Sequence, residues 1–336
     1  MSKIRYGFIL CAAVLCLAFL GSTGCRGESQ PAGRSGFALD TAVSITLYAF
    51  ADGALSSQAL LDGCFAELER YEQLLSAERE DSDIGRLNQA EGNPVPLSEE
   101  TIELLQIGLQ YGKLTNGALD ITIRPASRLW NFQGSPALPD PADLSAAAAL
   151  VDYRNLHLDG LTAWLTDPDA AVDLGGIAKG YIADRLASYL TKNGVKSALL
   201  DLGGNIVALG NKEGEDWKIG VRDPSDENAL AAVIPVQNAS VVTSGTYERG
   251  FWLDGVRYHH LLEPKTGWPV QNGLSSVTIV SPLSVDGDAL STACFVLGEE
   301  KALSLIESLP DVEALFIRDD GSLSASSGLI YTVPAA

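Results

Sequence analysis

A strand–turn–helix pattern in the middle of the chain constrains its fold more than any other feature. Residues 172–184 read Val-Asp-Leu-Gly-Gly-Ile-Ala-Lys-Gly-Tyr-Ile-Ala-Asp. They predict a short apolar strand ending at Asp173, a glycine turn, and a helix that Asn193-Gly194 terminates. Free N–H groups at the start of such a helix can bind an anion. The alternative is an ordinary strand-to-helix turn that binds nothing.

Lys179 lies in the first turn of this predicted helix. A cation is unfavourable there, because the N-terminal end of a helix carries partial positive charge. Contact with a phosphate group would explain the position, and a solvated lysine is the alternative. The segment matches neither the Walker pattern nor the dinucleotide fingerprint, so a phosphate site here belongs to another class of protein.

The N-terminus predicts export. A basic start precedes the apolar run from Phe8 to Leu20, and small residues then lead to Cys25. We expect residues 1–24 to be a lipoprotein signal peptide, with a lipid attached to Cys25. Plain secretion and an uncleaved anchor are the alternatives.

The next residues predict a tether and then one folded unit. Residues 25–36 are rich in Gly, Ser, Pro and Gln, which is typical of a flexible linker. Residues 37–336 are long enough, in a chain with 46% hydrophobic residues, to form a sizeable core. Cys64 and Cys294 lie in apolar helical patterns and are predicted to be buried thiols.

The net charge limits the partners. At −20 the chain would repel nucleic acid, and it has no attraction for an anionic lipid surface. Binding to a membrane would therefore depend on a lipid at Cys25. A metal cluster of the Cys/His type is excluded, because the chain has three histidines and few cysteines.

Helical and β-type patterns alternate along the chain without repeats. Phe37 to Phe50 predicts a strand, and helical spacing follows over 54–75 and again after Ser98, which suits a helix N-cap. The second half consists mainly of short β-rich runs, with helices expected at about 287–297 and 299–308. We expect a single α+β unit with mixed sheets, whose halves share a cleft.

A carboxylate and a hydroxyl are spaced for a metal. Asp288 and Thr292 are four residues apart, so on a helix they lie one above the other. Two such oxygens suit Mg²⁺, which takes its other ligands from water and from substrate phosphates. The alternative is an aspartate that caps the helix and a threonine that is merely buried.

Four further segments carry polar groups of less specific meaning. Asp120 falls in a predicted strand and needs a partner, either Arg124 or the N–H groups of a turn. Glycine-containing runs at 200–205 and 242–249 follow predicted strands, where a ligand or an ordinary turn would fit. Of the neighbours His259 and His260, only one can face a given site, because adjacent strand residues point to opposite faces.

Together, and in this order, these segments resemble the bacterial FAD:protein FMN transferases of the ApbE family, from about Leu39 to Gly298. The resemblance implies a T-fold-related α+β unit with a flavin cleft, which binds FAD with Mg²⁺. It also implies transfer of the FMN half to a Thr or Ser hydroxyl of a target flavoprotein, forming a phosphoester and releasing AMP. The expected acceptor is an exported or membrane redox flavoprotein, and the expected location is the extracytoplasmic face of the cell membrane, held by a lipid.

The resemblance also assigns roles to residues. Asp288, Thr292 and the carbonyl of Gly176 are similar to the family's metal ligands. His260 resembles the histidine near the acceptor hydroxyl and is the expected base, with Asp173 as the alternative. The FAD site would be lined by Leu39, Ala118, Leu119, Asp120, Asp173, Lys179 and Leu261.

Two departures from the family pattern affect the expected activity. Glu78 stands where the family often has an aromatic residue that stacks on the flavin, and a carboxylate cannot stack in that way. Glu78 therefore keeps an FAD pyrophosphatase as an alternative, and it could bind a second metal. Leu39-Asp40-Thr41 replaces the usual Met-Gly-Thr. A third reading is a non-catalytic flavin-binding lipoprotein.

Overall fold

The computed structural model describes residues 31–132 and 134–334. The predicted signal peptide, Cys25 and the first part of the predicted tether lie outside the described residues. The tether prediction is wrong for its last residues, because Ala32–Ala38 forms strand β1 and pairs antiparallel with β2 (Thr41–Phe50). The single strand expected from Phe37 is therefore a hairpin, with its turn at Leu39 and Asp40.

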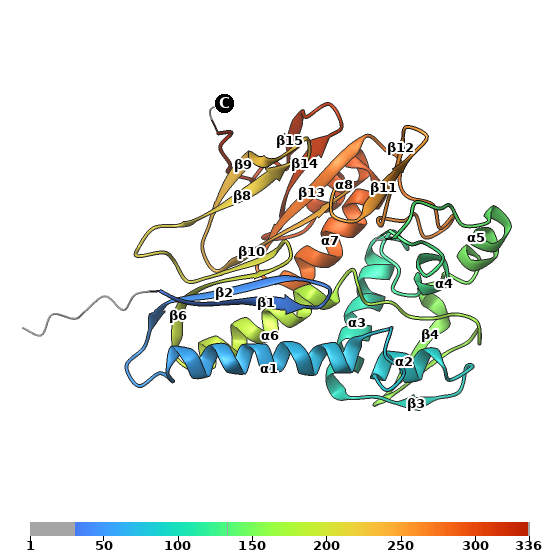
Figure 1. Ribbon diagram of the computed structural model, residues 1–336, viewed down its shortest axis with the longest axis horizontal. Helices are drawn as coiled ribbons and strands as arrows, with labels where there is room; N and C mark the ends of the chain where they lie inside the picture. The colour runs from blue at the N-terminus through green and yellow to red at the C-terminus, as the bar shows by residue number, and fades with distance from the viewer. Residues whose placement is uncertain (1–30, 133, 335–336) are drawn as a thin grey trace, which may run out of the picture. The chain divides into compact units, whose positions relative to one another are not determined.

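The main element is an eight-stranded sheet with the order β1-β2-β6-β7-β10-β13-β14-β15 (Figure 1). Each pairing between neighbouring strands of this sheet is antiparallel. The remaining strands are β6 (Val195–Leu202), β7 (Asn205–Leu209), β10 (Ala239–Gly245), β13 (Leu274–Ser281), β14 (Glu313–Arg318) and β15 (Leu323–Ala325).

Both faces of this sheet are apolar, and each buries its residues against a different layer. In β14, Ala314 and Phe316 face a cluster that includes helix residues, while Leu315 and Ile317 face the opposite side. That opposite side packs against the hairpin of β8 (Trp217–Asp223) and β9 (Asp226–Val236). The alternation follows from the two-residue period of a strand.

Helices cover the first face (Figure 1). They are α1 (Ser57–Leu75), α6 (Ala178–Lys192), α7 (Ser284–Leu297) and α8 (Glu299–Ile306). The helix expected to end at Asn193-Gly194 does so, because Asn193 caps α6 and Gly194 adopts a positive φ of 87°. Cys64 on α1 and Cys294 on α7 are buried free thiols, as predicted.

The remaining described elements form a smaller part beside this sheet. It contains α2 (Asp83–Asn88), α3 (Glu99–Leu114), α4 (Arg124–Ser127), α5 (Pro141–Ala148) and the 3₁₀ turn η1 (Tyr153–Asn155). Its strands are β3 (Val95–Pro96), β4 (Leu156–Asp159) and β5 (Thr162–Leu165), and the hairpin of β11 (Gly250–Leu253) and β12 (Val256–His259). Ser98 caps α3 as predicted, since its hydroxyl accepts from the Thr101 amide at 3.2 Å. Among the described residues, no helix is both long and apolar enough to cross a membrane.

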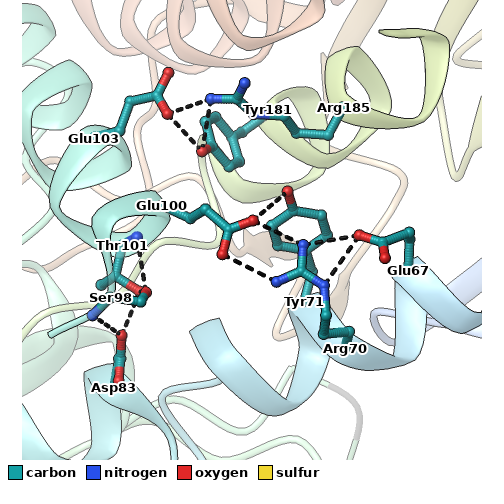
Figure 2. A network of polar contacts seen from close by, with 10 residues as sticks. All are labelled: Glu67, Arg70, Tyr71, Asp83, Ser98, Glu100, Thr101, Glu103, Tyr181 and Arg185. Atoms are coloured by element: carbon teal, nitrogen blue, oxygen red, sulfur yellow. Dashed lines mark hydrogen bonds and ion pairs between the residues drawn. The ribbon is translucent and has the colours of Figure 1, made fainter. Parts of the chain in front are cut away.

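A polar network joins α3 to α1 and α6 (Figure 2). Glu100 of α3 accepts from Arg70 at 2.8 Å and from the Tyr71 hydroxyl at 3.0 Å, and both donors lie on α1. Glu103 of α3 accepts from the Tyr181 hydroxyl of α6 at 2.9 Å and pairs with Arg185. These contacts fix α1 and α6, and the C-terminal end of α1 and the N-terminal end of α6 border the cavity described next.

Candidate functional site

A cavity of about 1450 Å³ lies between the large sheet, the start of α6, the face of α7 and residues 118–132. Its walls include every predicted site residue that the structure describes: Leu39, Glu78, Ala118, Leu119, Asp120, Asp173, Gly176, Lys179, His260, Leu261, Asp288 and Thr292. Residues far apart in the sequence are thus brought to one site.

Helix α7 contributes the two residues spaced for a metal. Asp288 is 3% exposed, and its Oδ2 accepts from the Gly180 amide at 2.8 Å. Among the described residues, no hydrogen-bond donor contacts its other carboxylate oxygen. The Thr292 hydroxyl lies 3.4 Å from the Ser244 hydroxyl at the end of β10. One carboxylate and two hydroxyls therefore converge at this wall.

Gly176 brings the turn before α6 next to the same wall. A Cβ on Gly176 would lie 3.7 Å from Thr292 Oγ1, so the backbone of the turn and the helix are close neighbours. Helices α6 and α7 also approach closely, because a Cβ on Gly180 would come within 2.3 Å of the Ser284 carbonyl oxygen. Glycine at position 180 lets its N–H reach Asp288.

The turn before α6, which was predicted to bind an anion, differs from the prediction in its backbone contacts. Asp173 does not end a strand, since only Ala171 forms an isolated bridge, with Ile123. The Gly175 amide donates to Asp173 Oδ1 at 2.9 Å, and the amides of Ile177 and Ala178 donate to the Leu174 carbonyl. These three N–H groups stabilise the turn itself and are not available to a ligand.

Asp120 also lies in a turn, so the prediction of a strand there is wrong. Its Oδ1 accepts from the amide and the hydroxyl of Thr122, and its Oδ2 accepts from the Tyr153 amide at 2.8 Å. The turn-closing alternative is therefore correct. Burial raises the pKa of the Asp120 carboxyl, and these hydrogen bonds oppose that effect.

The two neighbouring histidines diverge, as predicted. His259 is 2% exposed and donates through Nε2 to the Val270 carbonyl at 2.9 Å. His260 faces the cavity, and its Nδ1 lies 3.3 Å from the Arg249 carbonyl. A carbonyl only accepts, so Nδ1 carries the proton and Nε2 is free to take one. Burial lowers the pKa of His260 to about 3, which keeps the ring neutral at physiological pH.

Glu78 lies at the edge of the cavity and pairs with a cation. Its carboxylate is 79% exposed and lies 2.9 Å from Arg124, which is 16% exposed. That hydrogen bond lowers the pKa of Glu78. A second metal at Glu78 would compete with this guanidinium, which bonds to Oε1, for the carboxylate.

Three residues of this site escaped the sequence analysis. Ser244 lies beside Thr292, Asn205 accepts a hydrogen bond from Lys179 at 3.0 Å, and Glu248 projects into the cavity. Burial raises the pKa of Glu248 to about 7, while the charge of Lys179 acts in the opposite direction. All three belong to the glycine-containing runs at 200–205 and 242–249, but those runs alone did not distinguish a site from a turn.

The donor set fits a magnesium ion. The oxygen atoms near α7 come from the Asp288 carboxylate, the Thr292 and Ser244 hydroxyls and the Gly176 backbone. Hard cations prefer such oxygen ligands, and Mg²⁺ is usually held by one or two carboxylates together with substrate phosphates. Over residues 31–132 and 134–334 there is no cluster of three or more His, Cys, Asp and Glu side chains that would suit another metal.

Known proteins resemble this chain over most of its length. The ApbE family matches residues 39–316. A relative from Treponema pallidum (strain Nichols), named FAD:protein FMN transferase, is 39% identical over 98% of this chain and 95% of its own. One of the same name from Klebsiella pneumoniae (strain 342) is 39% identical over 80% of this chain and 85% of its own.

Solved structures agree with the sequence comparison. The flavin transferase ApbE from Vibrio cholerae has a TM-score of 0.80 and 31% identity, covering 89% of this chain and 97% of its own. The resemblance stated from the sequence and the expected α+β fold class are thereby confirmed. The chain belongs to the ApbE family.

Proposed function

We propose that this protein is an FAD:protein FMN transferase that uses Mg²⁺ and moves the FMN half of FAD to a Thr or Ser hydroxyl of a flavoprotein, releasing AMP. One observation carries the proposal. A single cavity combines an oxygen-only donor set at α7, the cation Lys179 and a neutral histidine in a chain of the ApbE family. The relatives bear the name of this activity.

Each group has a task in such a reaction. Asp288, Thr292 and the Gly176 carbonyl would hold the metal ion, with Ser244 beside them. Bound Mg²⁺ supplies charge neutralisation for the diphosphate oxygens. Lys179, at the start of α6, adds a second positive charge beside the metal ligands of α7. Phosphoryl transfer depends mainly on positioning and on such charge stabilisation.

His260 is the proposed base. The acceptor oxygen attacks the phosphorus of the FMN half, the P–O bond to AMP breaks, and the hydroxyl proton passes to Nε2 of His260. A neutral ring with Nδ1 bonded to the Arg249 carbonyl is in the correct state for this step. General base catalysis of this kind typically contributes about 10²–10⁴-fold.

Mass spectrometry tests the proposal. The protein is incubated with FAD, Mg²⁺ and a candidate acceptor flavoprotein, and the acceptor is scored for covalent FMN on a Thr or Ser. The proposal expects this adduct together with AMP. Bound FAD without any adduct or AMP would instead support a non-catalytic flavin-binding protein and would reject the transferase.

Hydrolysis of FAD to FMN and AMP is the second candidate. Glu78 favours it, because an exposed carboxylate paired with Arg124 provides no apolar surface to exclude water from the flavin end of the cavity. Release of AMP is measured with and without acceptor protein. A rate that does not depend on the acceptor would identify a pyrophosphatase.

We further propose that the protein acts outside the cytoplasmic membrane, held there by a lipid on Cys25. The acceptor would then be an exported or membrane redox flavoprotein. Support comes from the basic and apolar N-terminus followed by small residues and a cysteine. The charge of −20 gives no electrostatic attraction to an anionic bilayer, so the anchor would carry the association.

A further inference from the structure

In the run Asp201-Leu202-Gly203-Gly204-Asn205, the contacts of the turn do not account for the presence of Asn205. Gly203 and Gly204 have φ values of +63° and +93°, which glycine adopts most readily. Asp201 closes the turn by accepting from the Gly204 amide at 3.1 Å. These contacts form the link between β6 and β7, and Asn205 takes no part in them.

Asn205 is expected to lower the stability of the fold. Its side chain is 0% exposed, and its Nδ2 has no hydrogen-bond partner among the described residues. A buried N–H group without a partner destabilises the folded state, and an apolar side chain of the same shape would avoid that loss. Among the residues that the structure describes, its side-chain amide makes one hydrogen bond, which Lys179 Nζ donates to Oδ1 at 3.0 Å.

Lys179 has a charged competitor nearby. Glu248 lines the same cavity, and its Oε1 lies close to the turn before Asn205, since a Cβ on Gly204 would be 3.7 Å from it. Desolvation raises the pKa of this carboxyl, and the positive charge of Lys179 opposes that effect. Despite this attraction, Lys179 in the described structure bonds to the neutral amide of Asn205. A neutral acceptor orients the ammonium group without cancelling its charge, whereas a carboxylate would cancel it.

We propose that Asn205 is a positioning residue that holds Lys179 toward the phosphates of FAD and keeps it from pairing with Glu248. The inference rests on the proposed function, since it assumes that Lys179 contacts those phosphates. It explains why a buried amide with an unsatisfied N–H group occupies the first position of β7.

Asn205→Leu separates this role from a structural one. The variant removes the acceptor and the unpaired N–H group together. We expect about tenfold weaker FAD binding, which is the typical effect of losing a hydrogen bond to a charged group, with a Tm equal to or above that of the wild type. A structural role predicts a lower Tm. Asn205→Asp keeps an acceptor but adds a negative charge, so FAD binding should weaken there too.

Trp217→Phe is the matched control. Its indole N–H is also buried without a partner among the described residues, but Trp217 packs against Tyr48, at a ring-centroid distance of 5.0 Å, and makes no hydrogen bond to Lys179. Removing that N–H should leave FAD binding unchanged. Binding is followed by flavin fluorescence with Mg²⁺ and without acceptor, alongside thermal unfolding of each variant.

A double variant tests the competition with Glu248. Adding Glu248→Gln to the Asn205→Leu background removes the competing carboxylate, so part of the lost FAD affinity should return. Wild-type affinity in Asn205→Leu, a fall in Tm together with the affinity, or no recovery in the double variant would each overturn the positioning role. Failure of the wild-type protein to bind FAD would instead reject the proposed function.

Discussion

Asp288 uses its two carboxylate oxygens differently. Oδ2 accepts the Gly180 amide, which ties α7 to α6, while the other oxygen has no donor among the described residues. Oδ2 therefore positions the side chain, and the other oxygen is the one proposed to bind the metal. One substitution can separate these two roles.

Asp288→Asn keeps an oxygen acceptor for Gly180 but removes the negative charge. Because a bound metal contributes several kcal/mol to charge stabilisation, we expect the transfer rate to fall by at least about 100-fold, with little change in Tm. The measurement is the FMN transfer rate as a function of Mg²⁺ concentration. Asp286→Asn is the control, since Asp286 accepts from the Tyr111 hydroxyl at 2.7 Å and does not line the cavity. Equal losses in both variants would contradict the assignment.

His260→Gln preserves a donor for the Arg249 carbonyl but cannot take up the proton of the acceptor. The transfer rate should fall by about 10²–10⁴-fold, while FAD binding changes far less. Single-turnover transfer measures the first quantity and flavin fluorescence the second. The adjacent His259→Gln serves as control, because His259 points into the core. Transfer at the wild-type rate in His260→Gln would remove His260 as the base.

At the level of elements, short connections set the geometry of the site. Helix α7 has no N-cap side chain of its own, and Asp184 on α6 accepts from the amides of Ser284 and Val285 at 2.8 and 2.9 Å. This bond and the Gly180–Asp288 bond hold the two helices in register. The metal site and the lysine are therefore placed by one pair of helices.

The end of strand β12 should make the fold sensitive to acid. Burial lowers the pKa of His259 to about 4 from its ordinary value of 6.5. Between those values the unfolded chain binds more protons, so the free energy of unfolding falls as the pH drops. By linkage, His259 lowers the free energy of unfolding by about 2 kcal/mol as the pH falls from 8 to 5. His260 adds an effect of the same sign.

Urea unfolding at pH 5 and pH 8 measures this effect. His259→Gln still donates to the Val270 carbonyl and does not titrate, so its stability should fall by about 2 kcal/mol less than that of the wild type over this range. An identical pH dependence in both proteins would show that the pKa of His259 is the same in the folded and the unfolded state.

The β1–β2 turn is strained in its backbone. Leu39 and Asp40 have φ values of +53° and +57°, a region that favours glycine. Asp40→Gly should therefore raise the free energy of unfolding by about 1 kcal/mol. Asp52→Gly is the control, because Asp52 lies in the turn after β2 without a positive φ. Asp52→Gly should lower the free energy of unfolding. Stabilisation of both variants would contradict the claim that the backbone at Asp40 is strained.

At the scale of the whole molecule, location is the main prediction. Cys25→Ser should move the protein from the membrane to the soluble fraction of the exported material, because the proposed anchor is the lipid on Cys25 and a net charge of −20 gives no attraction to an anionic bilayer. Cell fractionation and the mass of the mature N-terminal peptide check this. Retention of the variant in the membrane would exclude the lipid as the anchor.

Local patterns were sufficient for several features. The apolar spacing of α1, the Ser98 cap, the end of α6 and the divergence of His259 and His260 each depend on residues close together in the chain. The same local patterns misplaced Asp120 and Asp173 in strands. The contacts of these two residues are partly local, with the Thr122 and Gly175 amides. The others come from distant segments: the Tyr153 amide donates to Asp120, and the Asp173 amide donates to the Ile121 carbonyl.

The sequence by itself determined the α+β class, the family and a set of candidate residues that all line the cavity, because motif order and side-chain period are properties of the chain alone. Only the tertiary structure decided what each group contacts. It brought the Tyr153 amide to Asp120, Arg124 to Glu78 and Asn205 to Lys179. Hydrogen bonds and ion pairs act over a few ångströms, so they follow from how the elements pack together.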